Sequence, residues 1–131
     1  MGDVYTFILP LYITIPRKTK EDRNISLNMN VYRNLHHAIN SDIKRRFEPI
    51  HCEAWKGEAN KIIVIYEVQK KGNRLFDTMN FVSVVDKFFL DWLQKKGLLS
   101  DDTCKNVSYR EITGSCGWDS NQLVATVEVI E

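Results

Sequence analysis

The sequence has no apolar run that approaches the ~20 residues needed to span a bilayer, so we expect no membrane-spanning helix and no membrane partner. Residues 4–15 are apolar, but no basic segment precedes them and Pro10 interrupts them, which argues against a signal peptide. Internal repeats, linkers and low-complexity segments are also absent. The length of 131 residues and the hydrophobic content of 44% then predict one globular domain over residues 1–131.

Cysteine is scarce, and Cys52, Cys104 and Cys116 lie far apart in the chain. This odd count and wide spacing fit neither a disulfide framework nor a zinc site, so we expect a reducing compartment such as the cytoplasm. His36 and His37 have no third ligand at metal spacing, and we expect them to be surface or partly buried residues.

Net charge is also small, at +1, and says little about partners. The distribution of charge says more, because residues 1–76 contain 13 Lys and Arg against 8 Asp and Glu, whereas residues 77–102 contain 3 against 5. All five acids of the second segment are aspartates. An aspartate-rich segment in an otherwise basic chain suggests metal ions that act on a polyanion. On the counts alone, ordinary variation between surface elements is the favoured explanation.

Secondary-structure patterns predict the order strand, helix, strand, helix, strand, strand, which corresponds to a mixed α+β fold with a small sheet. A polar, basic loop is expected at residues 16–24, and a hairpin loop at 114–121 should join the last two strands. The expected ranges are 4–15, about 28–47, 61–69, 81–96, 105–113 and 123–130.

The first helix is expected to begin after Ser26 or Asn28, either of which can act as an N-cap, and to end before Pro49. Its apolar residues at 31, 35, 39 and 43 define one buried stripe. The strand at 61–69 has a continuous apolar run, which predicts a central strand covered on both faces.

The second helix, at 81–96, has apolar residues over an arc of roughly 180°, whereas one contact layer needs only ~100°. Asn80 is a possible cap at its start, and Gly97 is expected to close its end in a Schellman motif. The wide apolar arc suggests that the helix packs on its own sheet and on a second subunit, as in a homodimer. The alternative is a helix that is sandwiched within a single domain.

Carboxylates surround the second helix in the sequence. Asp77 precedes it, Asp86 lies on its polar stripe, and Asp101 and Asp102 follow its end. These groups can converge on one point, where carboxylates, water and phosphate would bind Mg²⁺. Ordinary structural roles are the alternatives: Asp101 and Asp102 in a turn, and Asp91 on the surface in an i, i+4 pair with Lys87. Lys87 can also contact phosphate next to a metal site or be a plain surface lysine.

Three stretches of the chain, residues 74–80, 83–93 and 97–102, resemble the RusA-like endodeoxyribonucleases of phages and prophages, which resolve Holliday junctions. The family pattern is an Asp-x-Asp-Asn start, a helical Lys with an Asp four residues later, a Gly, and an Asp-Asp pair. The resemblance is specific over about residues 74–113 and looser over 5–47. The residues that match the pattern are Asp77, Asn80, Lys87, Asp91, Gly97, Asp101 and Asp102.

The resemblance implies a dimeric, Mg²⁺-dependent enzyme, with Mn²⁺ as a possible substitute and no organic cofactor, in the cytoplasm of a bacterium or phage-infected host. It identifies Asp77 as the first metal-binding aspartate, Lys87 as the catalytic lysine and Asp102 as the last catalytic aspartate, with Asp101 beside it. Asn80 and Asp91 are supporting residues. Metal ligands are therefore expected at Asp77, Asp86, Asp101 and Asp102, and catalytic groups at Asp77, Asp86, Lys87 and Asp102.

The chain departs from the family pattern at Met79, which replaces the second aspartate and cannot bind Mg²⁺ usefully. The spacing from Asp77 to Lys87 is also about one helical turn longer than in the prototype. We expect Asp86 to take over the missing role from the inserted turn.

Basic residues in three places can follow the phosphate backbone of branched DNA, although each cluster taken singly is more often a solvated surface. The expected function is cleavage of four-way junctions or related branched DNA. The alternatives are a non-catalytic DNA-binding phage accessory protein on the same scaffold and a purely structural dimer. The candidate DNA-binding residues are Arg17, Lys18, Lys20, Arg23, Lys44, Arg45, Arg46, Lys70, Lys71 and Arg74.

Overall fold

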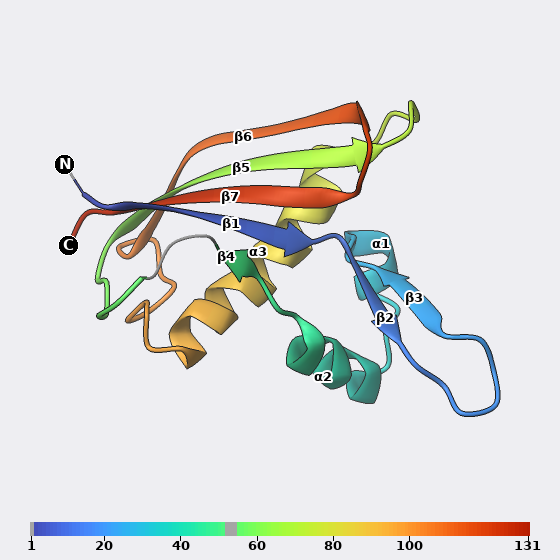
Figure 1. Ribbon diagram of the computed structural model, residues 1–131. Helices are drawn as coiled ribbons and strands as arrows, with labels where there is room; N and C mark the ends of the chain where they lie inside the picture. The colour runs from blue at the N-terminus through green and yellow to red at the C-terminus, as the bar shows by residue number, and fades with distance from the viewer. Residues whose placement is uncertain (1, 52–54) are drawn as a thin grey trace.

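A computed structural model of the chain describes residues 2–51 and 55–131, and it has the predicted mixed α+β fold (Figure 1). Cys52 lies outside the described residues. In chain order the elements are β1 (Val4–Pro10), β2 (Tyr12–Ile15), β3 (Arg23–Ser26), α1 (Met29–Tyr32), α2 (His37–Arg46), β4 (Ile50–His51), β5 (Ile62–Lys71), α3 (Thr78–Lys95), β6 (Val107–Trp118) and β7 (Gln122–Val129).

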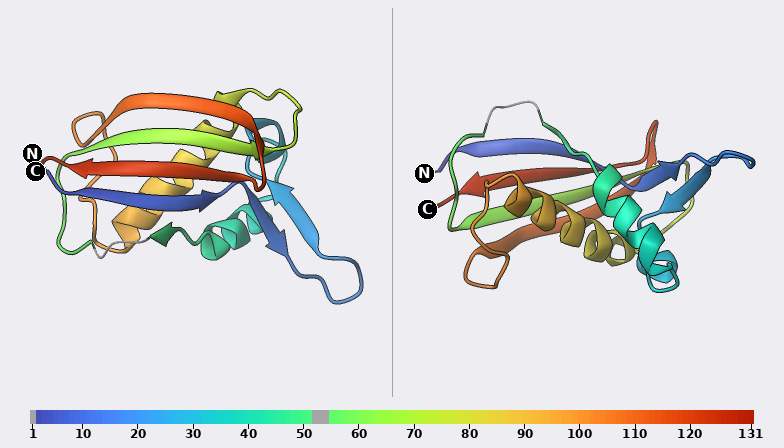
Figure 2. Two further views of the ribbon diagram at one scale, coloured as in Figure 1. Left: turned by 45° about the horizontal axis from the view of Figure 1, so that its top comes forward. Right: turned by 90° about the horizontal axis from the view of Figure 1, so that it is seen from below.

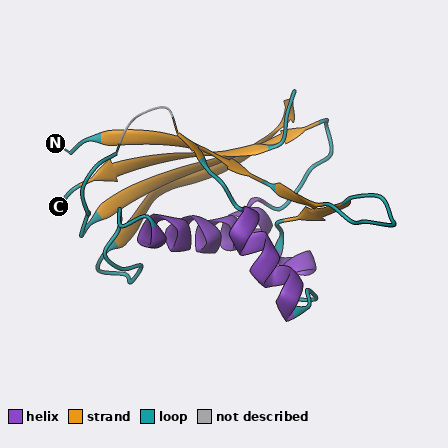
Figure 3. Cartoon of the chain, turned by 60° about the horizontal axis from the view of Figure 1, so that its bottom comes forward, coloured by secondary structure: helices purple, strands orange, loops and turns teal. Residues whose placement is uncertain are grey.

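The main sheet has five strands in the order β4-β1-β7-β5-β6. Only β5 and β6 are parallel, and α3 connects them as the crossover helix. β2 and β3 form a separate two-stranded arm that extends away from the main sheet (Figure 1). All described helices lie on one side of the main sheet (Figures 2 and 3).

The limits of α3 follow from its caps. Asp77 is the N-cap, because its Oδ1 accepts a hydrogen bond of 3.1 Å from the Met79 N–H, so the helix begins before the expected cap at Asn80. At the other end Gly97 has a φ of 73°, and the Leu98 N–H reaches the Leu93 carbonyl at 2.9 Å. The predicted Schellman motif is therefore confirmed.

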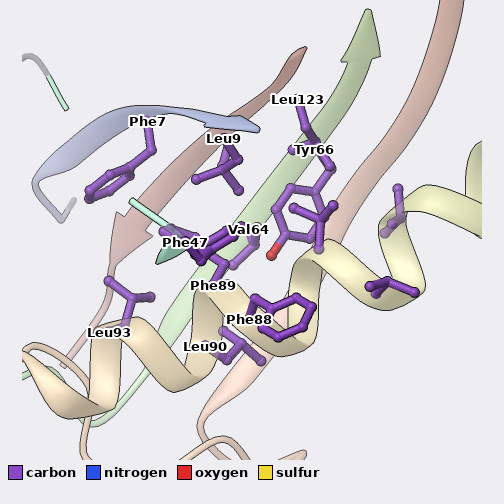
Figure 4. Packing of buried hydrophobic residues seen from close by; sticks show 14 of the residues in the cluster. Phe7, Leu9, Phe47, Val64, Tyr66, Phe88, Phe89, Leu90, Leu93 and Leu123 are labelled. Carbon is purple, nitrogen blue, oxygen red and sulfur yellow. The ribbon is translucent and has the colours of Figure 1, made fainter. Parts of the chain in front are cut away.

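The core lies between α3 and the sheet (Figure 4). Phe89 is fully buried, and its ring centroid is 5.1 Å from that of Phe7 and 6.4 Å from that of Tyr66. On its other side α3 meets the segment of α1 and α2, where Phe88 stacks on Phe47 at 5.7 Å. The wide apolar arc of α3 is thus buried within one chain, so it no longer argues for a second subunit.

The first helix is not continuous, contrary to the prediction of one helix over about 28–47. Asn28 caps α1 as expected, through its Oδ1 and the Val31 N–H at 3.0 Å, but α1 makes only one turn. The Asn34 side chain donates a hydrogen bond of 2.9 Å to the Asn30 carbonyl. In a continuous helix this carbonyl would accept the backbone N–H of Asn34 instead. The helix restarts at α2, with His36 as N-cap, and the C-cap at Phe47 precedes Pro49.

The predicted strand at 4–15 is divided at Leu11, where the chain leaves the main sheet and enters β2. β3 begins at Arg23, inside the expected loop at 16–24. β5 confirms the strand at 61–69, but its residues alternate between buried and half-buried. Its second face has no described helix over it, so the expectation of cover on both faces is wrong (Figure 3).

The last two strands do not form the predicted hairpin. β6 pairs with β5, and β7 pairs with β1 and β5, so that β5 lies between the two strands that the loop joins. Alternation of apolar residues predicts a strand but not its neighbour, which is why the sequence did not show this order. Among the described residues, no helix has the length and apolarity to cross a bilayer, and Cys104 and Cys116 are free thiols.

Candidate functional site

The side chain of Asp86, on the polar stripe of α3, links this helix to two strands of the main sheet. Its Oδ1 accepts a hydrogen bond from the hydroxyl of Tyr66 on β5, and its Oδ2 accepts one from the hydroxyl of Tyr109 on β6. Tyr66 is fully buried, with its ring directed toward α3 (Figure 4), whereas Tyr109 is 44% exposed. The carboxylate therefore lies between the crossover helix and the two parallel strands that it connects.

A β-bulge shapes this side of the sheet. Val64 pairs with Tyr109 and Ile65 pairs with Glu111, so Arg110 is an extra residue in β6. A bulge changes the direction of the side chains that follow it. Tyr109, before the bulge, and Ile112, after it, are three residues apart, yet Ile112 packs against the core and Tyr109 bonds to Asp86. Arg110 forms an ion pair with Glu128 at 3.1 Å.

The environment of Asp86 disfavours its negative charge. Burial raises the pKa of Asp86, the hydroxyl groups of Tyr109 and Tyr66 lower it, and the charge of Asp102 raises it further, with a net upward shift. Among the described residues, no Lys or Arg forms an ion pair with Asp86. Burial likewise raises the pKa values of Tyr66 and Tyr109, and the nearby carboxylate raises them further, so both hydroxyls remain proton donors at neutral pH.

Asp102 lies in the loop after α3, and its negative charge raises the pKa values of both Asp86 and Tyr109. Its side chain is exposed, and its backbone N–H donates to Oδ1 of Asp101 at 2.8 Å. The Asp101 carboxylate is therefore engaged with the backbone of its own loop, and the turn in this loop comes later, at residues 104–106. The Asn106 side chain fixes this loop to the Asn60 carbonyl at 2.9 Å.

Asp77 does not join this group. It caps the N-terminus of α3, nine residues before Asp86, which corresponds to about 13 Å along the helix axis at ~1.5 Å per residue. Among the described residues, no three His, Cys, Asp or Glu side chains are grouped so that they could hold a metal ion. Of the predicted set, Asp102 is near enough to Asp86 for its charge to raise the pKa of that carboxyl, whereas Asp77 lies at the N-terminal end of α3.

Lys87 and Asp91 do not pair with each other, contrary to the i, i+4 expectation. The Lys87 Nζ lies 5.5 Å from the ring centroid of Tyr32 on α1, a cation–π distance. Asp91 instead forms an ion pair with Lys44 of α2, at 3.4 Å. Both contacts dock the α1–α2 segment onto α3, and Lys87 is directed toward that segment while Asp86 is directed toward the sheet.

The basic clusters differ in how many of their charges are neutralised. Lys44 pairs with Asp91, and Arg45 and Arg46 both pair with Asp42, so little free charge remains at the end of α2. In the arm, the described structure records no ion pair for the exposed side chains of Arg17, Lys18, Lys20 and Arg23. Lys70, Lys71 and Arg74 line a pocket at the start of α3 together with Asp77 and Asn80.

Tyr66 and Tyr109, the two hydrogen-bond donors to Asp86, were not among the site residues predicted from the sequence. For Tyr66 a signal was present, because it has the only polar side-chain group in the run from Ile62 to Tyr66 and lies in a strand expected to be buried. A buried hydroxyl needs a hydrogen-bond partner, and the polar stripe of the next helix supplies one. No comparable signal marks Tyr109, because its direction depends on the bulge.

No protein-family model and no curated protein sequence matches the chain.

Proposed function

We propose that the chain is a Mg²⁺-dependent endonuclease that cleaves four-way junctions or related branched DNA. One observation carries the proposal: Asp86 is a half-buried carboxylate with a raised pKa and a second carboxylate nearby, and its donors among the described residues are two neutral hydroxyl groups. Such an arrangement lowers stability unless a cation is bound, and perturbed carboxylates of this kind concentrate at functional sites. The resemblance to RusA-like nucleases in residues 74–113 independently marks Asp102.

The residues present suit Mg²⁺ in a site with few protein ligands. Mg²⁺ is usually held by one or two carboxylates, while waters and substrate phosphate complete its shell. Asp86 and Asp102 would hold it here, and the mutual repulsion of their charges favours a cation between them. When bound, the ion would supply charge stabilisation at the phosphate and a water of lowered pKa. Mn²⁺ has the same ligand preference and should substitute for it.

The chain itself supplies orientation and substrate binding. The hydroxyls of Tyr66 and Tyr109 fix the plane of the Asp86 carboxylate by donating one hydrogen bond to each oxygen. The arm and the start of α3 present basic side chains to the phosphate backbone. We also propose a homodimer, since cutting two strands of a four-way junction requires two such sites.

A second candidate is a DNA-binding protein without catalytic activity. The position of Asp77 favours it, because a carboxylate that the nuclease resemblance assigns to the metal instead caps α3, about 13 Å from Asp86. In that case the basic residues would bind DNA and Asp86 would only link α3 to β5 and β6.

Incubation with a labelled four-way junction separates the two candidates. The proposed nuclease should cut the junction in Mg²⁺ and not in EDTA, and should leave a linear duplex of the same sequence intact. Salt-sensitive binding of the junction without a cut in either Mg²⁺ or Mn²⁺ would favour the binding protein.

A further inference from the structure

A pocket of about 390 Å³ lies beside the start of α3, away from Asp86. Its walls come from segments that are far apart in the sequence: the end of β5 and the connection to α3 on one side, and β2, β3 and α1 on the other. The residues that determine its chemistry are Lys70, Lys71, Arg74, Asp77, Ser26 and Tyr12.

Lys70 is held in this pocket by aromatic residues rather than by an acid. Its Nζ donates to the hydroxyl of Tyr12 and lies 4.7 Å from the ring centroid of Tyr12 and 4.9 Å from that of Phe81. The residue is half-buried, and no described carboxylate forms an ion pair with it. An ammonium group has three donors, and the Tyr12 oxygen accepts only one of them. The pocket therefore contains an oriented, partly desolvated cation with free donors.

The charge balance of the pocket also favours an anion. Three cations line it against one acid, Asp77, one of whose oxygens accepts the Met79 N–H. Ser26 adds a hydroxyl whose oxygen already accepts from the Asn28 side chain, so its own hydrogen is available to a ligand. The basic residues at the end of α2 differ from this cluster, because carboxylates pair with them.

We propose that this pocket binds a backbone phosphate of the DNA, with Lys70 as the central ligand and Lys71 and Arg74 beside it. This inference rests on the proposed function for the identity of the ligand, but it does not require cleavage. The pocket is about 13 Å along α3 from Asp86, so it would fix the position of the strand on one side of the cleavage site.

The test is the affinity for a short fluorescein-labelled single strand, measured by anisotropy in EDTA so that no cleavage occurs. Lys70→Met keeps the aliphatic packing on Tyr12 and Phe81 but removes the charged donor. We expect roughly tenfold weaker binding, the usual effect of losing a hydrogen bond to a charged group. The slope of log affinity against log salt should fall by about 0.7, the value for one phosphate contact in a single strand.

Lys95→Met is the matched control, because it removes the same charge from the exposed last turn of α3, at the opposite end of that helix from the pocket. It should leave the affinity and the salt slope near those of the parent. Equal effects of the two variants would overturn the proposal. If Lys70→Met does not fold, Arg74→Gln, at an exposed residue of the pocket, takes its place with the same expectations.

Two further comparisons complete the test. The first distinguishes a backbone phosphate from a terminal phosphate, and the second distinguishes the phosphate pocket from the proposed nuclease activity. Strands with and without a 5′-phosphate should be affected equally by Lys70→Met; an effect confined to the 5′-phosphorylated strand would assign the pocket to a terminal phosphate and overturn the backbone assignment. Loss of binding in a protein that never cuts junctions would support the pocket and refute the nuclease. If the parent cuts junctions and Lys70→Met binds the strand as tightly as the parent, the nuclease proposal is supported and the phosphate pocket is refuted.

Discussion

At the scale of single residues, Asp86 is an anion that is stabilised by two neutral hydroxyl groups and opposed by its burial. Its pKa is raised above the ordinary aspartate value of 3.8, so the folded protein binds the proton more tightly than the unfolded chain does. The stability that this provides is fully present below about pH 3.8 and is lost as the pH rises through the folded pKa of Asp86.

Asp86→Asn should therefore become more stable than the parent as the pH rises. The amide keeps the shape of the side chain and can still bond to a tyrosine hydroxyl, but it carries no charge to desolvate. Urea unfolding in EDTA from about pH 4 to about pH 8 tests this by comparing the free energies of unfolding. A difference between the two proteins that does not change with pH would show that burial does not oppose the charge.

Tyr66→Phe should show that the hydroxyl supports the ionised carboxylate. The change removes a donor from a fully buried site, and we expect a loss of about 1–3 kcal/mol at neutral pH. The loss should shrink at low pH, where Asp86 is protonated. Tyr32→Phe is the control, because the described structure records no hydrogen bond from its hydroxyl, and its stability should change little at either pH. An equal loss at both pH values would show that the Tyr66 hydroxyl does not favour the ionised form of Asp86.

The candidate site was only partly predictable at this scale. The position of Asp86 on the polar stripe was sufficient to select it, because helical periodicity is a local property. The convergence of Asp77 with the other aspartates was not confirmed, since Asp77 caps a helix that begins at Thr78 and therefore lies a long way from the middle of that helix. Tyr109 could not be found, because the pairing of β6 with β5 determines its direction.

At the scale of elements, the parallel unit of β5, α3 and β6 builds the site, and one glycine allows its close packing. A Cβ atom on Gly114 of β6 would be 2.2 Å from Oγ1 of Thr78 and 3.2 Å from the ring of Phe76. The start of α3 thus lies against β6 at a distance that only glycine permits.

Gly114→Ala should lower the free energy of unfolding by roughly 1–3 kcal/mol, the usual cost of overpacking. The double variant with Thr78→Ala should recover part of this loss, because the shortest contact is removed. Chemical denaturation of the parent, the two single variants and the double variant measures the coupling. Additive effects would mean that Gly114 and Thr78 do not meet.

Local patterns predicted the elements better than their arrangement. The end of α3, its Schellman motif and the strand β5 follow from nearby residues, and the structure has them, although α3 begins at Thr78, three residues before the expected start. The break between α1 and α2 depends on the Asn34 side chain taking a backbone acceptor, which a four-residue apolar spacing does not reveal. The separation of β6 from β7 depends on a strand from elsewhere in the chain.

At the scale of the whole molecule, the chain buries the apolar arc of α3 between its sheet and its own α1–α2 segment. A homodimer must therefore use another surface. The arm and the pocket at the start of α3 concentrate basic residues for which the described structure records no ion pair on one part of the molecule, whereas Asp86 lies in the middle of α3 and Asp102 in the loop after it.

The proposed role of Asp86 in metal binding can be tested by cleavage of a labelled four-way junction by Asp86→Asn in Mg²⁺. We expect no cleavage, with junction binding retained or tighter because one negative charge fewer faces the DNA. Asp91→Asn is the control: Asp91 pairs with Lys44 at a partly exposed site, so this variant should cut at a rate close to that of the parent. If the parent cuts the junction and Asp86→Asn cuts it at the same rate, Asp86 is not a ligand of the catalytic metal.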